Sequence, residues 1–233
     1  MLSVVIPTYN EEKVISNTLM EIQKHFERKC IPYEIIVVDD GSGDSTVRIV
    51  EALIKENKKL MLLRNISRCG KGAAVRKGLL NASGKYIMFC DADLSTPIEE
   101  TSKFLEWAAA GYDIVIGSRR LPESEIQGFQ PYTRTLARFL LQYLVKIVVR
   151  GFNDTQCGFK CFTKKAARDI FNKQKINGYA FDVEVLYIAK RLNYKIKEVP
   201  IKWAYSSFSK INVFSDSLKM VKDILKIRLD PPI

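Results

Sequence analysis

The sequence predicts an α/β protein with a doubly wound, mostly parallel central sheet and helices on both faces. Strand-like and helix-like segments alternate through residues 1–120. The strand-like segments are nearly continuous runs of Val, Ile and Leu, as expected where helices cover both faces of a sheet. Polar clusters directly follow several of these runs, at the positions where ligands bind in such sheets.

Five segments of this first part are expected to be strands, and the four segments between them are expected to be helices. The strands are expected over residues 2–6, 33–39, 60–63, 86–90 and 113–117. The helices are expected over residues 12–27, 45–56, 73–81 and 99–109. Alternation of this kind predicts parallel strands, whose carboxyl ends meet at one edge of the sheet.

The sequence changes in character after Arg120. A loop, a strongly apolar stretch with a few cations, and a turn-rich stretch are expected over residues 121–130, 133–149 and 153–163. A helix, a strand and a basic amphipathic helix are expected over residues 181–192, 196–203 and 213–229. We expect one domain, in which residues 1–120 and 121–233 form two halves with different roles.

The chain is basic, with 37 Lys and Arg against 26 Asp and Glu and a net charge of +11. This charge favours a polyanionic partner, which can be nucleic acid, anionic lipid or a phosphorylated substrate. The aromatic residues do not interleave with the cations, and the sequence contains no RNA- or DNA-binding motif. We therefore do not expect a nucleic-acid partner, although a basic binding module remains the non-enzymatic alternative.

Other classes of site and segment are not expected from the composition. No run reaches the roughly 18 apolar residues that span a bilayer. The apolar residues 1–6 lack a basic lead and are interrupted at Pro7, so we do not expect a signal peptide. The five cysteines form no CxxC pair, and His25, expected on a polar helix face, is the only histidine. We expect reduced thiols, no zinc and no histidine-dependent chemistry.

The triplet Asp91-Ala92-Asp93 is the most informative motif because it ends a buried apolar run. Two carboxylates one residue apart at a strand end can converge on one hard cation. A divalent cation at that position can bridge diphosphate oxygens and neutralise a leaving nucleotide. The alternative is a solvated acidic turn.

Two other predicted strand ends carry residues that suit a nucleotide. After the first strand, Tyr9 could stack on or hydrogen-bond a base, and Glu11 could accept from a ribose or a base edge. Helix capping by Asn10 is the alternative for this segment. At the second strand end, a carboxylate such as Asp39 commonly holds a base or ribose. Lys71, flanked by glycines before a helix, suits phosphate, or is simply part of a helix start.

The order and spacing of these motifs resemble those of glycosyltransferase family 2, the inverting enzymes of the GT-A fold. The resemblance rests on Pro7-Thr8-Tyr9-Asn10-Glu11, Asp39-Asp40-Gly41-Ser42, Gly70-Lys71-Gly72, Asp91-Ala92-Asp93 and Gly117-Ser118-Arg119. Three later motifs resemble the dolichyl-phosphate glucosyltransferase branch: Asp154-Thr155-Gln156-Cys157-Gly158-Phe159-Lys160, Phe181-Asp182-Val183-Glu184 and Glu198-Val199-Pro200-Ile201-Lys202-Trp203. The resemblance covers nearly the whole chain.

The resemblance implies a nucleotide-sugar site across the strand ends. It assigns donor binding to Pro7, Tyr9, Glu11, Asp39, Lys71, Asp91 and Asp93. Asp91 would contact ribose, diphosphate or metal, and Asp93 would be the principal ligand of Mg²⁺ or Mn²⁺. Relatives often carry Gln two residues after the second Asp, where this chain has Ser95, so a third protein ligand stays open.

The resemblance also implies an acceptor site. Arg119, Arg134 and Lys210 match positions that hold the acceptor lipid phosphate, although each can be a solvated surface cation. Arg119 and Arg134, with Asp93, are the expected catalytic residues. Asp182 and Glu184 would contact sugar hydroxyls or brace the cations, or one would serve as a base. A lipid phosphate is already anionic and needs no base, whereas a hydroxyl acceptor requires one.

The implied activity is transfer of a hexose, expected to be glucose from UDP-glucose, to a polyprenyl phosphate such as dolichyl phosphate. The implied location is peripheral, on the cytosolic face of a membrane. A mannosyltransferase using GDP-mannose and a soluble family 2 enzyme acting on a glycan hydroxyl are the alternatives. Residues 136–149 and 213–229 are candidates for membrane contact. The first can instead be a core helix or the interface of a homo-oligomer, and the second a packed terminal helix.

Overall fold

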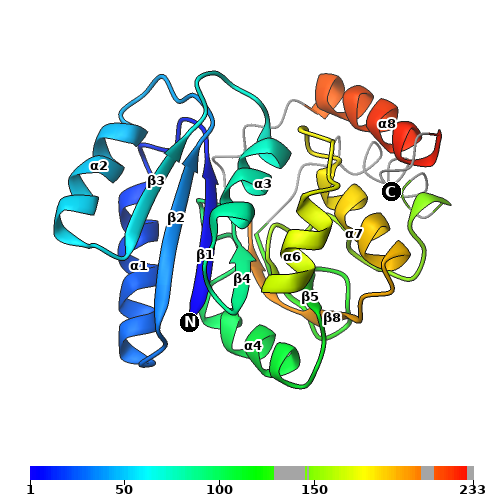
Figure 1. Ribbon diagram of the computed structural model, residues 1–233, viewed down its shortest axis with the longest axis horizontal. Helices are drawn as coiled ribbons and strands as arrows, with labels where there is room; N and C mark the ends of the chain where they lie inside the picture. The colour runs from blue at the N-terminus through cyan, green and yellow to red at the C-terminus, as the bar shows by residue number, and fades with distance from the viewer. Residues whose placement is uncertain (129–144, 146, 206–212, 230–233) are drawn as a thin grey trace.

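The computed structural model describes residues 1–128, 145, 147–205 and 213–229 and is drawn in Figure 1. A seven-stranded sheet has the strand order β3-β2-β1-β4-β7-β5-β8. Its strands are β1 (Leu2–Thr8), β2 (Tyr33–Asp39), β3 (Leu60–Arg64), β4 (Tyr86–Phe89), β5 (Ile114–Ser118), β7 (Lys160–Thr163) and β8 (Ile196–Pro200). β7 is antiparallel to β4 and β5, and the other pairs are parallel. The predicted doubly wound, mostly parallel sheet is confirmed.

Helices cover both faces of this sheet (Figure 1). They are α1 (Ile15–Arg28), α2 (Thr46–Glu56), α3 (Lys71–Asn81), α4 (Thr101–Ala109), α6 (Lys164–Phe171), α7 (Phe181–Arg191) and α8 (Val213–Leu229), with a 3₁₀ turn over Ile98–Glu100. Successive strand residues point to opposite faces. Val5 of β1 therefore packs with α3, α6 and α7, whereas Val4 and Ile6 pack with α1, α2 and α4. This double burial explains why the central strands β1, β2 and β4 are mostly apolar on both faces.

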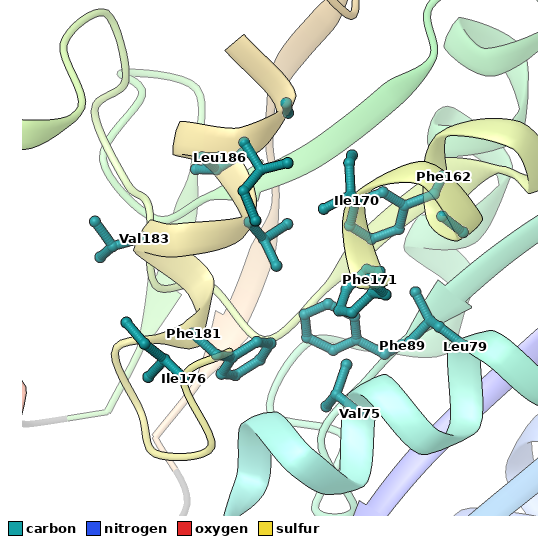
Figure 2. Packing of buried hydrophobic residues seen from close by; sticks show 14 of the residues in the cluster. Val75, Leu79, Phe89, Phe162, Ile170, Phe171, Ile176, Phe181, Val183 and Leu186 are labelled. Atoms are coloured by element: carbon teal, nitrogen blue, oxygen red, sulfur yellow. The ribbon is translucent and has the colours of Figure 1, made fainter. Parts of the chain in front are cut away.

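Aromatic side chains fill much of the core on the α3, α6 and α7 face. Figure 2 shows Phe89 of β4, Phe171 of α6 and Phe181 of α7 gathered there above Val75 of α3. The Phe89 and Phe181 ring centroids lie 5.8 Å apart. This packing fixes the first turn of α7 against the carboxyl end of β4, which positions the site described below.

The structure differs from the sequence prediction at residues 125–127, where a short strand lies in an expected loop, and between residues 153 and 204. β7 and α6 were not expected; they are only four and eight residues long, shorter than the windows in which periodicity is judged. The single strand expected over residues 196–203 is two strands. β9 (Lys202–Ala204) pairs with β6 (Glu125–Gln127) in a separate two-stranded sheet. The break follows Pro200, which has no N–H with which to continue a ladder.

His25 is buried, so its expected place on a polar helix face is wrong. Its residue is 3% exposed, and neither ring nitrogen has a hydrogen-bond partner among the described residues. Ile22 and Phe26 are buried with it at helical spacing, and this places His25 on the inward face of α1. Burial lowers the pKa of His25, although Glu99 nearby opposes that shift.

The two segments expected to contact a membrane are described to different extents. Residues 136–149 lie largely outside the described residues, and Arg134 and Lys210 lie outside them entirely. The helix expected over residues 213–229 is confirmed as α8. Among the described residues, every helix is too short or too polar to cross a bilayer.

Candidate active site

One edge of the sheet gathers most of the predicted site residues. The carboxyl ends of β1, β2, β4 and β5 meet there because these strands are parallel in direction. β7 runs the other way, so it begins at this edge, where Lys160 pairs in register with both Phe89 and Ile116. The amino end of α3 also lies there, because Lys71 contacts Asp91.

Asp39, the last residue of β2, has one carboxylate oxygen committed and one available. Its Oδ2 accepts from the backbone N–H groups of Gly41 and Ser42, at 3.1 Å each. Its Oδ1 is buried and has no partner among the described residues. A buried acceptor normally has a partner. The open Oδ1 therefore suits an N–H or O–H donor of a ligand, such as a base or a ribose.

The loops after β1 and β2 are tied together beside Asp39. The Asn10 backbone N–H donates to Ser42 Oγ at 2.8 Å, and the Gly43 N–H returns a bond to Asn10 Oδ1 at 2.8 Å. The Glu11 N–H donates to Thr46 Oγ1 at 2.7 Å. Asn10 adopts a positive φ of 56°, a conformation that Asn tolerates better than most residues. This link holds the segment that carries Tyr9 and Glu11 at the sheet edge.

Asp40 shapes the segment that leads to Lys71. Its carboxylate accepts from the backbone N–H groups of Cys69 and Gly70, at 2.9 and 2.7 Å. On the same segment, the Arg68 guanidinium lies 4.2 Å from the centre of the Tyr9 ring. Asp40 was not expected to be a site residue, because its contacts are with a segment about 30 positions away.

Lys71 and Asp91 form an ion pair at the centre of the edge. Lys71 Nζ lies 2.5 Å from Asp91 Oδ1, and the Asp91 side chain is 39% exposed. Burial alone would lower the pKa of Lys71, but the carboxylates of Asp91 and Asp182 outweigh it and raise that pKa. Gly158 packs directly on Asp91, where any Cβ would overlap the carboxylate. Lys71 therefore stays positively charged, and it lies beside a carboxylate that is partly exposed to solvent.

Asp93 lies on the turn that follows Asp91. One of its oxygens, Oδ1, accepts from the Ser95 backbone N–H at 3.0 Å. The Ser95 carbonyl accepts from the Ala204 N–H at 2.7 Å, which ties this turn to β9. Among the described residues, no group of three or more His, Cys, Asp or Glu side chains could hold a metal ion. The pair Asp91 and Asp93 nevertheless fits a magnesium-like ion, which commonly takes one or two carboxylates and completes its shell with substrate phosphates and water.

Arg119, directly after β5, is held by Asp154. Its Nε and Nη2 donate to Asp154 Oδ2 and Oδ1 at 2.6 and 2.9 Å. Burial would raise the pKa of Asp154, but Arg119 outweighs burial and holds that pKa well below its usual range. The guanidinium also lies 5.7 Å from the Trp203 ring centre. The Arg119 side chain remains 19% exposed, so it can present a fixed positive charge to a ligand.

A second buried ion pair lies beneath the edge and was missed by sequence reasoning. Lys160 is fully buried, and its Nζ donates to Asp182 Oδ1 at 2.5 Å and to the Cys157 carbonyl at 2.6 Å. Burial raises the pKa of Asp182, while Lys160 and Lys71 oppose the rise. The pair could not be predicted from local sequence, because Lys160 and Asp182 are 22 positions apart and meet only in the folded chain.

Glu184 is also committed to the protein. It is 1% exposed and accepts from the backbone N–H groups of Lys175 and Ile176, at 2.9 and 2.8 Å. Burial raises its pKa. Both carboxylates that sequence reasoning offered as sugar contacts or bases, Asp182 and Glu184, therefore have internal partners.

Comparison with family models places this edge in a known context. The model of glycosyl transferase family 2 matches residues 3–171, which include β1, β2, β4, β5 and β7. The chain belongs to glycosyl transferase family 2. The resemblance expected from the motifs is confirmed.

Relatives and solved structures are similar to nearly the whole chain. Dolichyl-phosphate beta-glucosyltransferase of Dictyostelium discoideum is 38% identical, covering 97% of this chain and 73% of that protein. The human protein of the same name is 36% identical, covering 98% and 75%. A glucosyl-3-phosphoglycerate synthase from Mycobacterium tuberculosis, solved with Mn²⁺, UDP-glucose and phosphoglyceric acid, superposes with a TM-score of 0.73 at 20% identity, covering 98% and 79%. This last likeness shows the shared fold.

Proposed function

We propose that this family 2 protein transfers glucose from UDP-glucose to a polyprenyl phosphate such as dolichyl phosphate, at a membrane surface. Its relatives of 36–38% identity carry the name dolichyl-phosphate beta-glucosyltransferase. In this proposal residues 1–120 bind the donor and residues 121–233 bind the acceptor. Arg134 and Lys210, which lie outside the described residues, are proposed with Arg119 as acceptor contacts.

The observation that favours a phosphate acceptor is the state of the two candidate bases. Asp182 is paired with buried Lys160, and Glu184 accepts from two backbone N–H groups. A hydroxyl acceptor would need one of them to take a proton. A phosphate acceptor is already anionic and needs only to be attracted and aligned, for which the fixed charge of Arg119 is suited.

In the proposed reaction, an oxygen of the acceptor phosphate bonds to the anomeric carbon of glucose. The bond from that carbon to the nucleoside diphosphate breaks, the diphosphate keeps the electron pair, and the configuration at carbon inverts. Lys71 carries a permanent positive charge beside the expected diphosphate position and offsets the charge that develops there. A divalent ion held by Asp91 and Asp93 would supply further neutralisation of the diphosphate. Asp39, Tyr9, Pro7 and Glu11 would hold the nucleoside.

A donor panel tests the proposal. Purified protein is incubated with a short-chain polyprenyl phosphate, a divalent cation, and radiolabelled UDP-glucose or GDP-mannose. We expect label from UDP-glucose in the lipid extract and a loss of that label when the cation is chelated. Label from GDP-mannose alone would instead identify a mannosyltransferase, and no label from either donor would refute the proposal.

A further inference from the structure

A hollow in the described structure is lined by cations and by apolar or aromatic side chains. It has a volume of about 440 Å³ and lies between the segment 147–150, the last turn of α7 and the last turn of α8. Four cations line it: Arg150, Lys190, Arg191 and Arg228. No carboxylate is among its described lining residues, which otherwise are apolar or aromatic. An electropositive hollow with apolar walls fits an anionic group attached to an apolar body.

The four cations differ in whether they bind other groups of the protein. Lys190 Nζ donates to the Arg150 carbonyl at 2.8 Å and lies 5.8 Å from the Phe152 ring centre, so part of its role is structural. Within the described part of the chain, Arg150, Arg191 and Arg228 enter no ion pair, and all three are exposed. Their charge is therefore available to an external anion.

Exposed apolar side chains adjoin these cations. Ile147, in the hollow, is 50% exposed. On α8, Leu225 and Leu229 are 48% and 82% exposed, and they lie on one side of the helix because they are four residues apart. Arg228 is three residues from Leu225 and borders that side. The inward side of α8 is occupied by Met220, Ile224 and Ile227, which pack in the core. Exposed apolar side chains therefore lie on the same surface as the cations of the hollow.

We propose that this surface, formed by residues 147–150, the end of α7 and the end of α8, docks on an anionic phospholipid bilayer. The cations would meet lipid phosphates, and Ile147, Leu225 and Leu229 would enter the boundary with the acyl chains. The inference deepens the proposed function, because a polyprenyl phosphate acceptor lies in a bilayer. The surface lies entirely in residues 121–233, the half of the chain proposed to bind the acceptor.

Vesicle binding by the full chain tests this surface. The probes are vesicles of phosphatidylcholine alone and of phosphatidylcholine mixed with phosphatidylglycerol, measured by co-sedimentation at low and high salt. The variant combines Arg150→Gln, Arg191→Gln and Arg228→Gln, and omits Lys190 because of its internal bond. The control combines Lys24→Gln, Lys55→Gln and Lys58→Gln, three exposed cations of α1, α2 and the turn after α2. Figure 1 shows α1 and α2 on the opposite side of the molecule from α8.

We expect binding to the mixed vesicles that high salt weakens. Each neutralised cation should lower the partition coefficient about fivefold, so the triple variant should lose about a hundredfold, since a basic residue near an anionic surface contributes about 1 kcal/mol. The control should lose far less. Equal losses in the two triple variants, or no binding of the unmodified chain to mixed vesicles, would overturn the proposal. The proposal would also be overturned if the triple arginine variant lost binding to a DNA oligonucleotide but bound the vesicles as the unmodified chain does.

A parallel assay separates this inference from the proposed function. Transfer of glucose to a water-soluble, short-chain polyprenyl phosphate is measured without vesicles. The triple variant should match the unmodified chain, because none of its positions lies at the sheet edge. If neither protein transfers glucose but vesicle binding still depends on the three arginines, the proposed function fails and the docking surface stands.

Discussion

Replacing Lys160 by methionine is the sharpest test of how the site is supported. The change removes a fully buried charge that holds both Asp182 and the Cys157 carbonyl. Removing one partner of a buried ion pair typically costs 3–5 kcal/mol, because the other charge is left uncompensated. We expect about 3 kcal/mol for Lys160→Met, at the lower end, because Lys71 also acts on Asp182.

Urea unfolding followed by tryptophan fluorescence measures this loss. The double variant Lys160→Met/Asp182→Asn should recover about 2 kcal/mol, because a neutral amide costs less to bury than an unpaired carboxylate. Lys165→Met is the matched control. Lys165 pairs with Asp169 but its side chain is 76% exposed. Its removal should change the free energy of unfolding far less than Lys160→Met does, because solvent screens an exposed pair.

The pH dependence supplies a second readout. Burial raises the pKa of Asp182 above its unfolded value, so the folded state holds this proton more tightly. Stability from this group is greatest at low pH and is lost as pH rises through the raised folded pKa. Without Lys160 that loss should extend to higher pH, and Asp182→Asn should abolish it. A Lys160→Met variant that loses under about 1 kcal/mol, or matches the double variant at every pH, would refute this reasoning.

Three further predictions concern the edge itself. Asp93→Asn should leave the turn and the melting temperature unchanged. It should lower kcat by about 10²–10³-fold, the usual effect of losing a charge-stabilising group. An unchanged kcat would show that Asp93 is not part of the site. Arg119→Ala should cost about 3–5 kcal/mol of unfolding free energy in urea, because Asp154 stays buried, whereas Arg119→Lys should cost less; equal costs would contradict the paired geometry. Gly158→Ala should raise the KM for the donor by displacing the carboxylate after β4, whereas Gly43→Ala, with open space around it, should not.

Sequence alone predicted much of the edge because local signals coincide there. The apolar runs of β1, β2 and β4 end where the chain needs polar turns, and parallel strands bring those ends together. Asp39, Asp91 and Arg119 could therefore be placed at one edge before any coordinates. Their roles were expected from the motif resemblance and not from geometry.

Long-range pairing could not be read from the sequence. Lys160 looks like one more surface cation in a turn-rich stretch, yet β7 enters the sheet there and buries it. Arg119 was expected to hold the acceptor phosphate, and nothing in the sequence indicated that its side chain also donates two hydrogen bonds to Asp154. His25 was placed on the wrong face because its polarity outweighed its spacing from Ile22. In each case the side chain's environment is set by a partner on another element or by the packing of the helix, and neither is visible in the local sequence.

The central claim is that the acceptor is a lipid phosphate and not a hydroxyl, and a comparison of two acceptors tests it most directly. Purified chain is given radiolabelled UDP-glucose with either dolichyl phosphate or dolichol, which differ only in the phosphate. We expect labelled lipid with dolichyl phosphate and none with dolichol, because an anionic phosphate acceptor needs no protein base and both Asp182 and Glu184 have internal partners. Equal labelling of dolichol, or label passing to a glycan hydroxyl and to neither lipid, would contradict it.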